Sequence, residues 1–288
     1  MSRGTERLVF SGRVPEGEWE RMRAPLQAGA FPFPVKYGYC AVGVVEDGPA
    51  EWMGRRVFCL HPHQDRFVAP VGFCAAVPEA VTNRRAVLTA NMETAVNALW
   101  DAAPLVGERA LVIGAGVVGL LVAWLLSRVP GTDVAVADPD AGRATVCAAL
   151  GLRWVAPEDA PGRRDLIVHA SGNPAGLRTA LRCAGFEARV IEASWFGAAE
   201  CALPLGETFH AGRVTIRSSQ VGSVSPAMRG RRTHGERMAL ALSLLDDPAL
   251  DALLGPEVAF RDLPAEMPRL LGAPREGEAA PLCPVVTY

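Results

Sequence analysis

The sequence has almost no net charge, few aromatic side chains and no C-x-x-C pair. Its 29 basic and 31 acidic residues leave a formal charge of −2, and aromatic residues make up 7%. Nucleic acids and anionic membranes attract proteins through a basic excess, so neither is expected as a partner. With 50% hydrophobic and 21% charged residues, the 288-residue chain can bury a sizeable core, which excludes a disordered protein.

The cysteines also restrict the interpretation. There are seven, an odd number, spread along the chain, and the N-terminus shows no signal-sequence pattern. Both features favour the reducing cytoplasm. Residues 110–126 carry no charge, but this stretch is marginally short for a membrane span and contains three glycines. A buried strand, turn and helix explain it better.

The chain divides into three parts. The first hundred residues are rich in Gly, Pro and aromatics, with short β-like runs at 42–46, 56–60 and 67–69. These runs predict a small, irregular, mostly β domain. A helix is expected over 83–101, where apolar residues recur at helical spacing.

From residue 107 onward, apolar strands alternate with helices. Strands are expected at 109–113, 133–137, 165–170, 188–193 and 214–218, and helices at 117–127, 141–150, 175–183 and 235–245. This alternation predicts a parallel sheet covered on both faces. The strand-like tail 284–288 could return to the first domain. We therefore expect one domain of residues 1–102 plus 247–288, and an inserted domain of residues 103–246.

A G-x-G-x-x-G motif follows the first strand of the inserted domain. In a dinucleotide site Gly114 makes the tight turn, Gly116 lets the backbone approach a pyrophosphate, and Gly119 permits close helix–strand packing. The helix that begins at Val117 and Val118 presents its backbone N–H groups to the phosphates. The alternative is a glycine-rich turn in an unrelated α/β fold.

An acidic residue supports the dinucleotide interpretation. Asp138 ends the second strand, at about the 20-residue distance from the glycines expected of a ribose-binding acid. Its carboxylate would accept from the ribose 2′-OH and repel a 2′-phosphate, so NAD is favoured over NADP. Arg143 could bind a phosphate, so NADP remains the alternative cofactor. Ser171 and Gln220, at later strand ends, complete the predicted cofactor edge, although Ser171 could simply cap a helix.

Three segments carry a resemblance to a known family. Ser2-Arg3-Gly4-Thr5-Glu6, the segment Lys36–Val45 and the dinucleotide motif are similar to the medium-chain dehydrogenase/reductase superfamily, over essentially the whole chain. The resemblance implies an α/β fold: a Rossmann doubly wound parallel sheet inserted in a discontinuous GroES-like, β-rich catalytic domain. Members usually have two or three strands before the first motif, so we expect a longer natural protein.

The sequence departs from the zinc-dependent members at every expected ligand. Arg3 stands where they have cysteine, Tyr39 where they have histidine, and the third ligand position falls near Ala90. Catalytic zinc needs three protein ligands, so the resemblance is to a zinc-free branch, and no metal is expected. The pattern is similar to that of bacteriochlorophyllide a dehydrogenases, which oxidise a hydroxyethyl group to acetyl.

One metal site remains as an alternative. Cys59, His61, His63 and Asp65 would face one side of an extended strand and could bind zinc. Pro62 interrupts that run. The two histidines are then polar or substrate-lining groups.

The resemblance implies a zinc-independent, NAD(P)-dependent enzyme that interconverts a secondary alcohol and a ketone on a small-molecule substrate. Tyr39 would donate to the carbonyl oxygen, Thr5 would relay the proton, and His61 or His63 would pass it to solvent. Tyr39 could instead merely fill the space of the missing metal. An enone or quinone reductase and a non-catalytic dinucleotide sensor are the alternatives, and a homodimer is left open.

Overall fold

The computed structural model describes residues 1–272 and 281–288. Contacts divide the chain into unit 1, residues 1–92 with 234–288, and unit 2, residues 93–233. Unit 1 therefore contains both ends of the chain. The domain limits predicted at 102/103 and 246/247 stay a prediction, and helix α3 (Thr89–Ala102) runs through the first border between the units.

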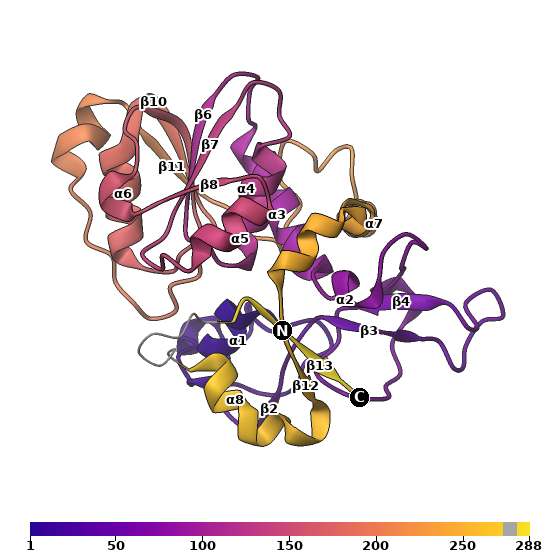
Figure 1. Ribbon diagram of the computed structural model, residues 1–288. Coiled ribbons are helices and arrows are strands. Elements are labelled where there is room, and N and C mark those ends of the chain that lie inside the picture. The colour runs from indigo at the N-terminus through magenta and orange to yellow at the C-terminus, as the bar shows by residue number, and fades with distance from the viewer. Residues whose placement is uncertain (273–280) are drawn as a thin grey trace. The chain divides into compact units, whose positions relative to one another are not determined.

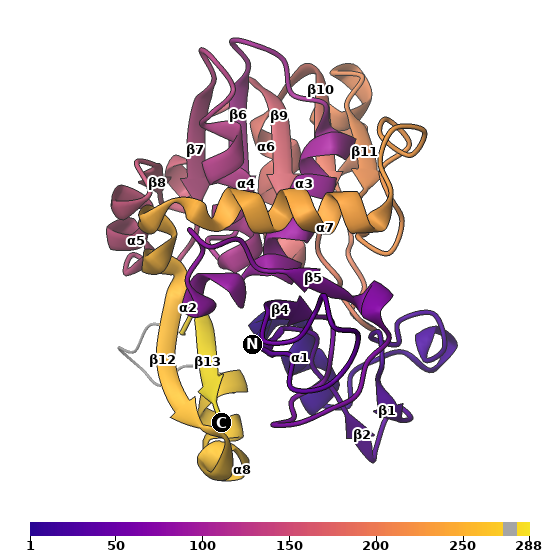
Figure 2. The ribbon, with the colours of Figure 1, turned by 90° about the vertical axis from the view of Figure 1, so that its right-hand side faces the viewer.

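Unit 2 is built around a six-stranded parallel sheet. Figure 2 shows the strands in the order β8, β7, β6, β9, β10, β11. Their bounds are β6 Arg109–Ile113, β7 Asp133–Ala137, β8 Arg153–Val155, β9 Arg164–His169, β10 Ala184–Glu192 and β11 Thr215–Ser218. The chain reverses its direction across the sheet between β6 and β9. Ligands of doubly wound folds bind at this switch point, beside the carboxyl ends of the strands.

Helices cover both faces of the sheet (Figure 1). Helix α4 (Val117–Leu126) packs on β6 and β7, and α5 (Arg143–Ala149) packs on β8. Helix α6 (Pro174–Cys183) packs on β9 and β10 from the other face. The strands are apolar because both faces are buried: residues 110–113 of β6 are at most 3% exposed. The strands predicted for this unit are present within a few residues, and β8 was missed.

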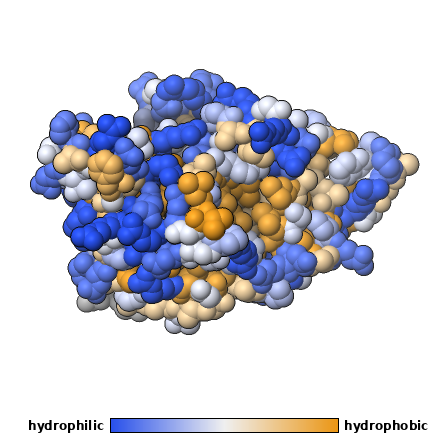
Figure 3. Space-filling view, turned by 90° about the horizontal axis from the view of Figure 1, so that it is seen from above, coloured by the Kyte–Doolittle hydropathy of each residue, from blue (hydrophilic) through white to orange (hydrophobic). Residues whose placement is uncertain are grey.

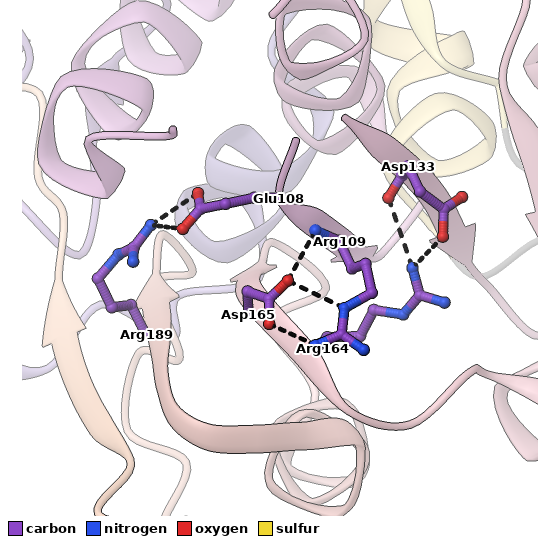
Figure 4. A network of polar contacts seen from close by, with 6 residues as sticks. All are labelled: Glu108, Arg109, Asp133, Arg164, Asp165 and Arg189. Carbon is purple, nitrogen blue, oxygen red and sulfur yellow. Dashed lines mark hydrogen bonds and ion pairs between the residues drawn. The ribbon is translucent and has the colours of Figure 1, made fainter. Parts of the chain in front are cut away.

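Arginine–carboxylate pairs gather at the amino ends of the strands (Figure 4). The pairs are Arg109 with Asp165, Arg164 with Asp133, and Arg189 with Glu108. Hydrogen bonding from Arg109 lowers the pKa of Asp165. Such partly exposed pairs contribute little to stability, because solvent screens their charges. They lie at the edge of the sheet opposite to the switch-point loops.

Unit 1 combines short strands with helices from both ends of the chain. Its sheets are β3-β4-β5, the hairpin β1-β2 and the parallel pair β12-β13. The bounds are α1 Arg3–Phe10, β1 Ala28–Gly29, β2 Val35–Lys36, β3 Ala41–Val44, β4 Arg56–Cys59, β5 Cys74–Ala76, α2 Asn83–Ala86, α7 His234–Ser243, β12 Leu254–Ala259, α8 Leu263–Leu271 and β13 Cys283–Thr287. The Arg3 side chain joins the two ends of the chain by donating to the carbonyl oxygens of Leu270 and Gly272.

Two predicted elements of unit 1 are wrong. Residues 67–69 form no strand, because Phe67 stacks on His61 and Val68 is 98% exposed. The third strand of the sheet is β5 instead. The helix predicted over 83–101 is broken at Val87, between α2, which Thr82 caps at its N-terminus, and α3.

The described surface mixes polar and apolar residues. On the face drawn in Figure 3, apolar atoms lie among mostly hydrophilic ones. Exposed apolar side chains include Leu105 and Val106, at 63% and 73%. Within residues 1–272 and 281–288, no helix has the length and apolar character needed to cross a bilayer.

Candidate functional site

The glycine motif forms the turn between β6 and α4. Gly114 has φ +105°, and a Cβ there would lie 2.8 Å from the backbone nitrogen of Ser171. A Cβ on Gly119 would lie 1.9 Å from the Gly114 carbonyl oxygen, so only glycine lets α4 approach this closely. A Cβ on Gly116 would meet nothing within 4 Å. The turn therefore has open space over Gly116, at the start of a helix whose first residues are Val117 and Val118, and a pyrophosphate fits this backbone.

Asp138 closes the other side of this turn. Its Oδ2 accepts from the backbone N–H of Ala115 at 2.7 Å, and its Oδ1 accepts from Asp140 N at 2.9 Å. The carboxylate is half-buried and keeps lone pairs for a ribose hydroxyl. Arg143, at the start of α5, has its Nε 3.2 Å from Oδ2 of Asp140 and is 11% exposed. This pairing gives the Arg143 guanidinium a carboxylate partner within the protein.

Ser171 and Gln220 lie at the same edge of the sheet, and both are exposed. Ser171 follows β9, and its Oγ is 2.6 Å from Nε2 of the fully buried His169. Gln220 follows β11, and its Oε1 accepts from the backbone N–H of Gly222 at 2.6 Å. Ser171 thus borders the glycine turn, whereas the Gln220 side-chain oxygen bonds its own loop.

A polar group of unit 1 surrounds the Tyr39 hydroxyl. Tyr39 is half-buried and forms hydrogen bonds with the side chains of Ser2 and Thr5. Ser2 Oγ in turn donates to Asn91 Oδ1 at 2.9 Å. Burial raises the pKa of Tyr39 well above its usual value, so the phenol keeps its proton at neutral pH. It is therefore a hydrogen-bond donor or a proton relay.

A buried ion pair lies beside this group. Nε2 of His63 is 2.9 Å from Oε2 of Glu6, whose other oxygen accepts from Ser2 N at 2.7 Å. Burial alone would raise the pKa of Glu6, but the charge of His63 and its hydrogen bond outweigh burial and lower it. Gly38 makes room for the pair, since a Cβ there would lie 2.9 Å from the His63 ring.

The alternative metal group does not assemble. Strand β4 ends at Cys59, so the residues after it do not share one side of a strand. The His61 ring stacks on Phe67 at 3.7 Å, and its Nδ1 lies 2.9 Å from the Pro62 oxygen. Burial lowers the pKa of His61. His61 and His63 therefore face different partners. The alternative in which Cys59, His61, His63 and Asp65 line one side of a strand as metal ligands is wrong.

The residues at the positions where zinc-dependent dehydrogenases of the resembled family have zinc ligands do not fit a zinc ion. Arg3 brings a positive charge and bonds backbone carbonyl oxygens near α8. Tyr39 presents a protonated phenol, and Ala90 has no donor atom. Among residues 1–272 and 281–288, no group of three or more His, Cys, Asp or Glu side chains could hold a metal.

Sequence reasoning missed four residues of these groups. Glu6 lies inside a quoted motif but was given no role, and Asn91 adjoins Ala90. The buried amide nitrogen of Asn91 has no hydrogen-bond partner within the described chain. His169 and Glu192 end neighbouring strands. A titratable residue at the carboxyl end of a sheet strand is the signal that could have found the last two.

No family model matches the chain. Several solved structures share its architecture. A short chain alcohol dehydrogenase from Escherichia coli CFT073, in complex with NADH, is 19% identical, with a TM-score of 0.70 over 87% of this chain and 83% of that one. The 2R,3R-butanediol dehydrogenase of Bacillus subtilis is 18% identical, with a TM-score of 0.68 over 87% and 80%.

A third structure covers nearly the whole chain. It is a Sinorhizobium meliloti 1021 protein, provisionally described as a zinc-binding dehydrogenase and bound to NADP. It is 14% identical, with a TM-score of 0.75 over 99% of this chain and 88% of that one. Likeness at this identity establishes the fold. The predicted fold class is confirmed: a Rossmann doubly wound sheet inserted in a discontinuous GroES-like domain.

Proposed function

We propose that the protein is a nicotinamide-dependent oxidoreductase that interconverts a secondary alcohol and a ketone without a metal, and that it prefers NAD to NADP. The observation that carries the proposal is the glycine turn of unit 2, with open space over Gly116 and Asp138 bonded to Ala115. Backbone N–H groups at the start of α4 would hold the pyrophosphate, and Asp138 the adenine-side ribose. The bound nicotinamide supplies or accepts the hydride.

The polar group of unit 1 would handle the proton. In the proposal, Tyr39 donates its phenolic hydrogen to the substrate oxygen and thereby polarises the carbonyl. Thr5, already bonded to that hydroxyl, relays the proton, and His63 passes it toward solvent. The homodimer stays a prediction.

The test is a screen of secondary alcohols with NAD and of ketones with NADH, read at the absorbance of reduced nicotinamide. Turnover with at least one pair, lost in Tyr39→Phe, is the expected result. Binding of NADH without turnover of any substrate would favour the non-catalytic sensor instead. Turnover confined to enones or quinones would identify the reductase alternative.

A further inference from the structure

A buried relay of three side chains ends at the carboxyl edge of the unit 2 sheet. Oε2 of Glu192 is 2.6 Å from Nδ1 of His169, and Nε2 of His169 is 2.6 Å from Oγ of Ser171. His169 is fully buried, the Glu192 side chain is 14% exposed, and Ser171 is exposed. The relay therefore runs from the interior of the sheet to a hydroxyl at its surface.

The bonding partners determine which way each hydrogen points. Oε1 of Glu192 accepts from Ser194 N at 2.7 Å, so both carboxylate oxygens act as acceptors. The Nδ1 atom of His169 must then carry the hydrogen, and in the neutral ring Nε2 is an acceptor. The Ser171 hydroxyl hydrogen accordingly points at Nε2.

One lone pair of Ser171 remains for a ligand. A hydroxyl oxygen has two lone pairs, and Asn173 N donates to one of them at 3.2 Å. Toward the exposed side Ser171 is therefore an acceptor and cannot donate. Phosphate oxygens are acceptors as well, whereas ribose hydroxyls can donate.

The location of Ser171 indicates which of the two riboses of a dinucleotide it would contact. Asp138 flanks the glycine turn from the β7 side, and Ser171 flanks it from the β9 side. A dinucleotide with its pyrophosphate on the turn and its adenine-side ribose at Asp138 must extend its other ribose past β9. We propose that Ser171, oriented by His169 and Glu192, accepts a hydrogen bond from a hydroxyl of this second ribose. The inference rests on the proposed dinucleotide function.

The neighbouring helix is shaped around the relay. A Cβ on Gly176, in α6, would lie 2.5 Å from Ser171 Oγ and 2.6 Å from His169 Nε2. Only glycine at this position leaves the Ser171–His169 bond room. The bond is thus accommodated by the packing of α6.

The same three side chains resemble a Ser-His-Glu hydrolytic triad, but the loop that follows Ser171 offers no free donor for an oxyanion. Within residues 172–175, Gly172 N donates to Ser194 Oγ, Asn173 N to Ser171 Oγ and Ala175 N to Asn173 Oδ1, and Pro174 has no N–H. A tetrahedral oxyanion would find no free backbone donor in this loop. The geometry therefore favours binding over acyl transfer.

The experiment compares two ligands by calorimetry near neutral pH. AMP has only the adenine-side ribose, and ADP-ribose has both riboses. Ser171→Ala should lower the affinity for ADP-ribose by about tenfold, as expected for one lost hydrogen bond, and leave the affinity for AMP unchanged. Glu192→Gln no longer imposes the histidine tautomer. It should lower the affinity for ADP-ribose by a smaller factor and leave the affinity for AMP unchanged.

Ser127→Ala is the matched control, since it removes a hydroxyl that bonds only the end of α4. It should change the affinity for neither ligand. If the wild type binds both AMP and ADP-ribose while Ser171→Ala leaves both affinities unchanged or lowers them equally, the proposed contact between Ser171 and the second ribose is wrong. If the wild type binds neither ligand, the proposed function itself fails. Stoichiometric labelling of Ser171 by a fluorophosphonate probe, abolished by His169→Gln, would overturn the binding role in favour of a nucleophile.

Discussion

The buried carboxylate of Glu6 lies 2.9 Å from Nε2 of His63, and this pair adjoins the polar group around Tyr39. Because the folded pKa of Glu6 is lowered, the pair stabilises the protein above the unfolded pKa of about 4.3. That contribution is lost as the pH falls through the lower folded value. The pair therefore links the stability of unit 1 to acid pH.

Glu6→Gln should lower the free energy of unfolding by about 2 kcal/mol near neutral pH, since it leaves buried partners of the carboxylate incompletely satisfied. Urea unfolding between neutral and acid pH measures this. Below the unfolded pKa of about 4.3 the difference from wild type should begin to shrink, because Glu6 of the unfolded chain then takes up a proton, and it should be smallest once the pH has fallen through the lower folded pKa. Glu18→Gln, at a surface pair with Arg21, is the control and should change stability by at most about 0.5 kcal/mol. Equal effects of the two variants would contradict the assignment.

Tyr39→Phe should lower turnover at least about tenfold, because the variant loses the donor to the substrate oxygen. NADH affinity should be unchanged, and Thr5→Val should have a milder effect. Steady-state kinetics on the best substrate, with NADH titration by fluorescence, measures both. Tyr288→Phe, which removes a phenol from an exposed residue, is the control. Full turnover in Tyr39→Phe would make Tyr39 structural, and the donor would then be sought at His61 or His63.

The wild type should bind NADH more tightly than NADPH, because the carboxylate of Asp138 repels a 2′-phosphate. Asp138→Ala should lower the affinity for NADH and reduce or reverse the preference for NADH over NADPH. Fluorescence titration of both cofactors measures it. Asp165→Asn, at the opposite edge of the sheet, removes a carboxylate of the same kind and should leave both constants unchanged. A wild-type preference for NADPH would sink the NAD assignment.

Activity should be insensitive to chelators, since Arg3, Tyr39 and Ala90 do not fit zinc. Elemental analysis and turnover after dialysis against a chelator check this. About one zinc per chain, whose removal abolishes activity, would count decisively against a metal-free mechanism. His61 and His63 would then be the first ligands to substitute.

Cys59 should resist alkylation in the folded protein. It is 1% exposed, and burial together with the thiol of Cys74 opposite raises its pKa to about 12. Only the thiolate reacts with iodoacetamide, so at about pH 8 the folded thiol is nearly inert. Peptide mass spectrometry should find Cys59 modified only after urea unfolding. Rapid modification of native protein would show that β4 opens readily.

Much of unit 2 could be predicted because its signals are local. Hydrophobic runs of strand length, the spacing of Gly114, Gly116 and Gly119, and an acid at the end of the next strand follow from backbone geometry and from burial on both faces of a sheet. The strands of unit 1 were predicted less well. Its short strands are stabilised by distant partners, so residues 67–69 have a strand-like composition without a strand to pair with.

The polar groups were decided by tertiary structure. The sequence by itself determined that Tyr39 replaces a metal ligand and that Asp138 ends a strand. It could not indicate that Glu6 meets His63 across 57 positions, or that His169 bonds both Glu192 and Ser171. Hydrogen bonds depend on distance and direction between atoms that folding brings together, and no periodicity along the chain encodes them. Residue type determined the chemistry available, and packing determined which atoms meet.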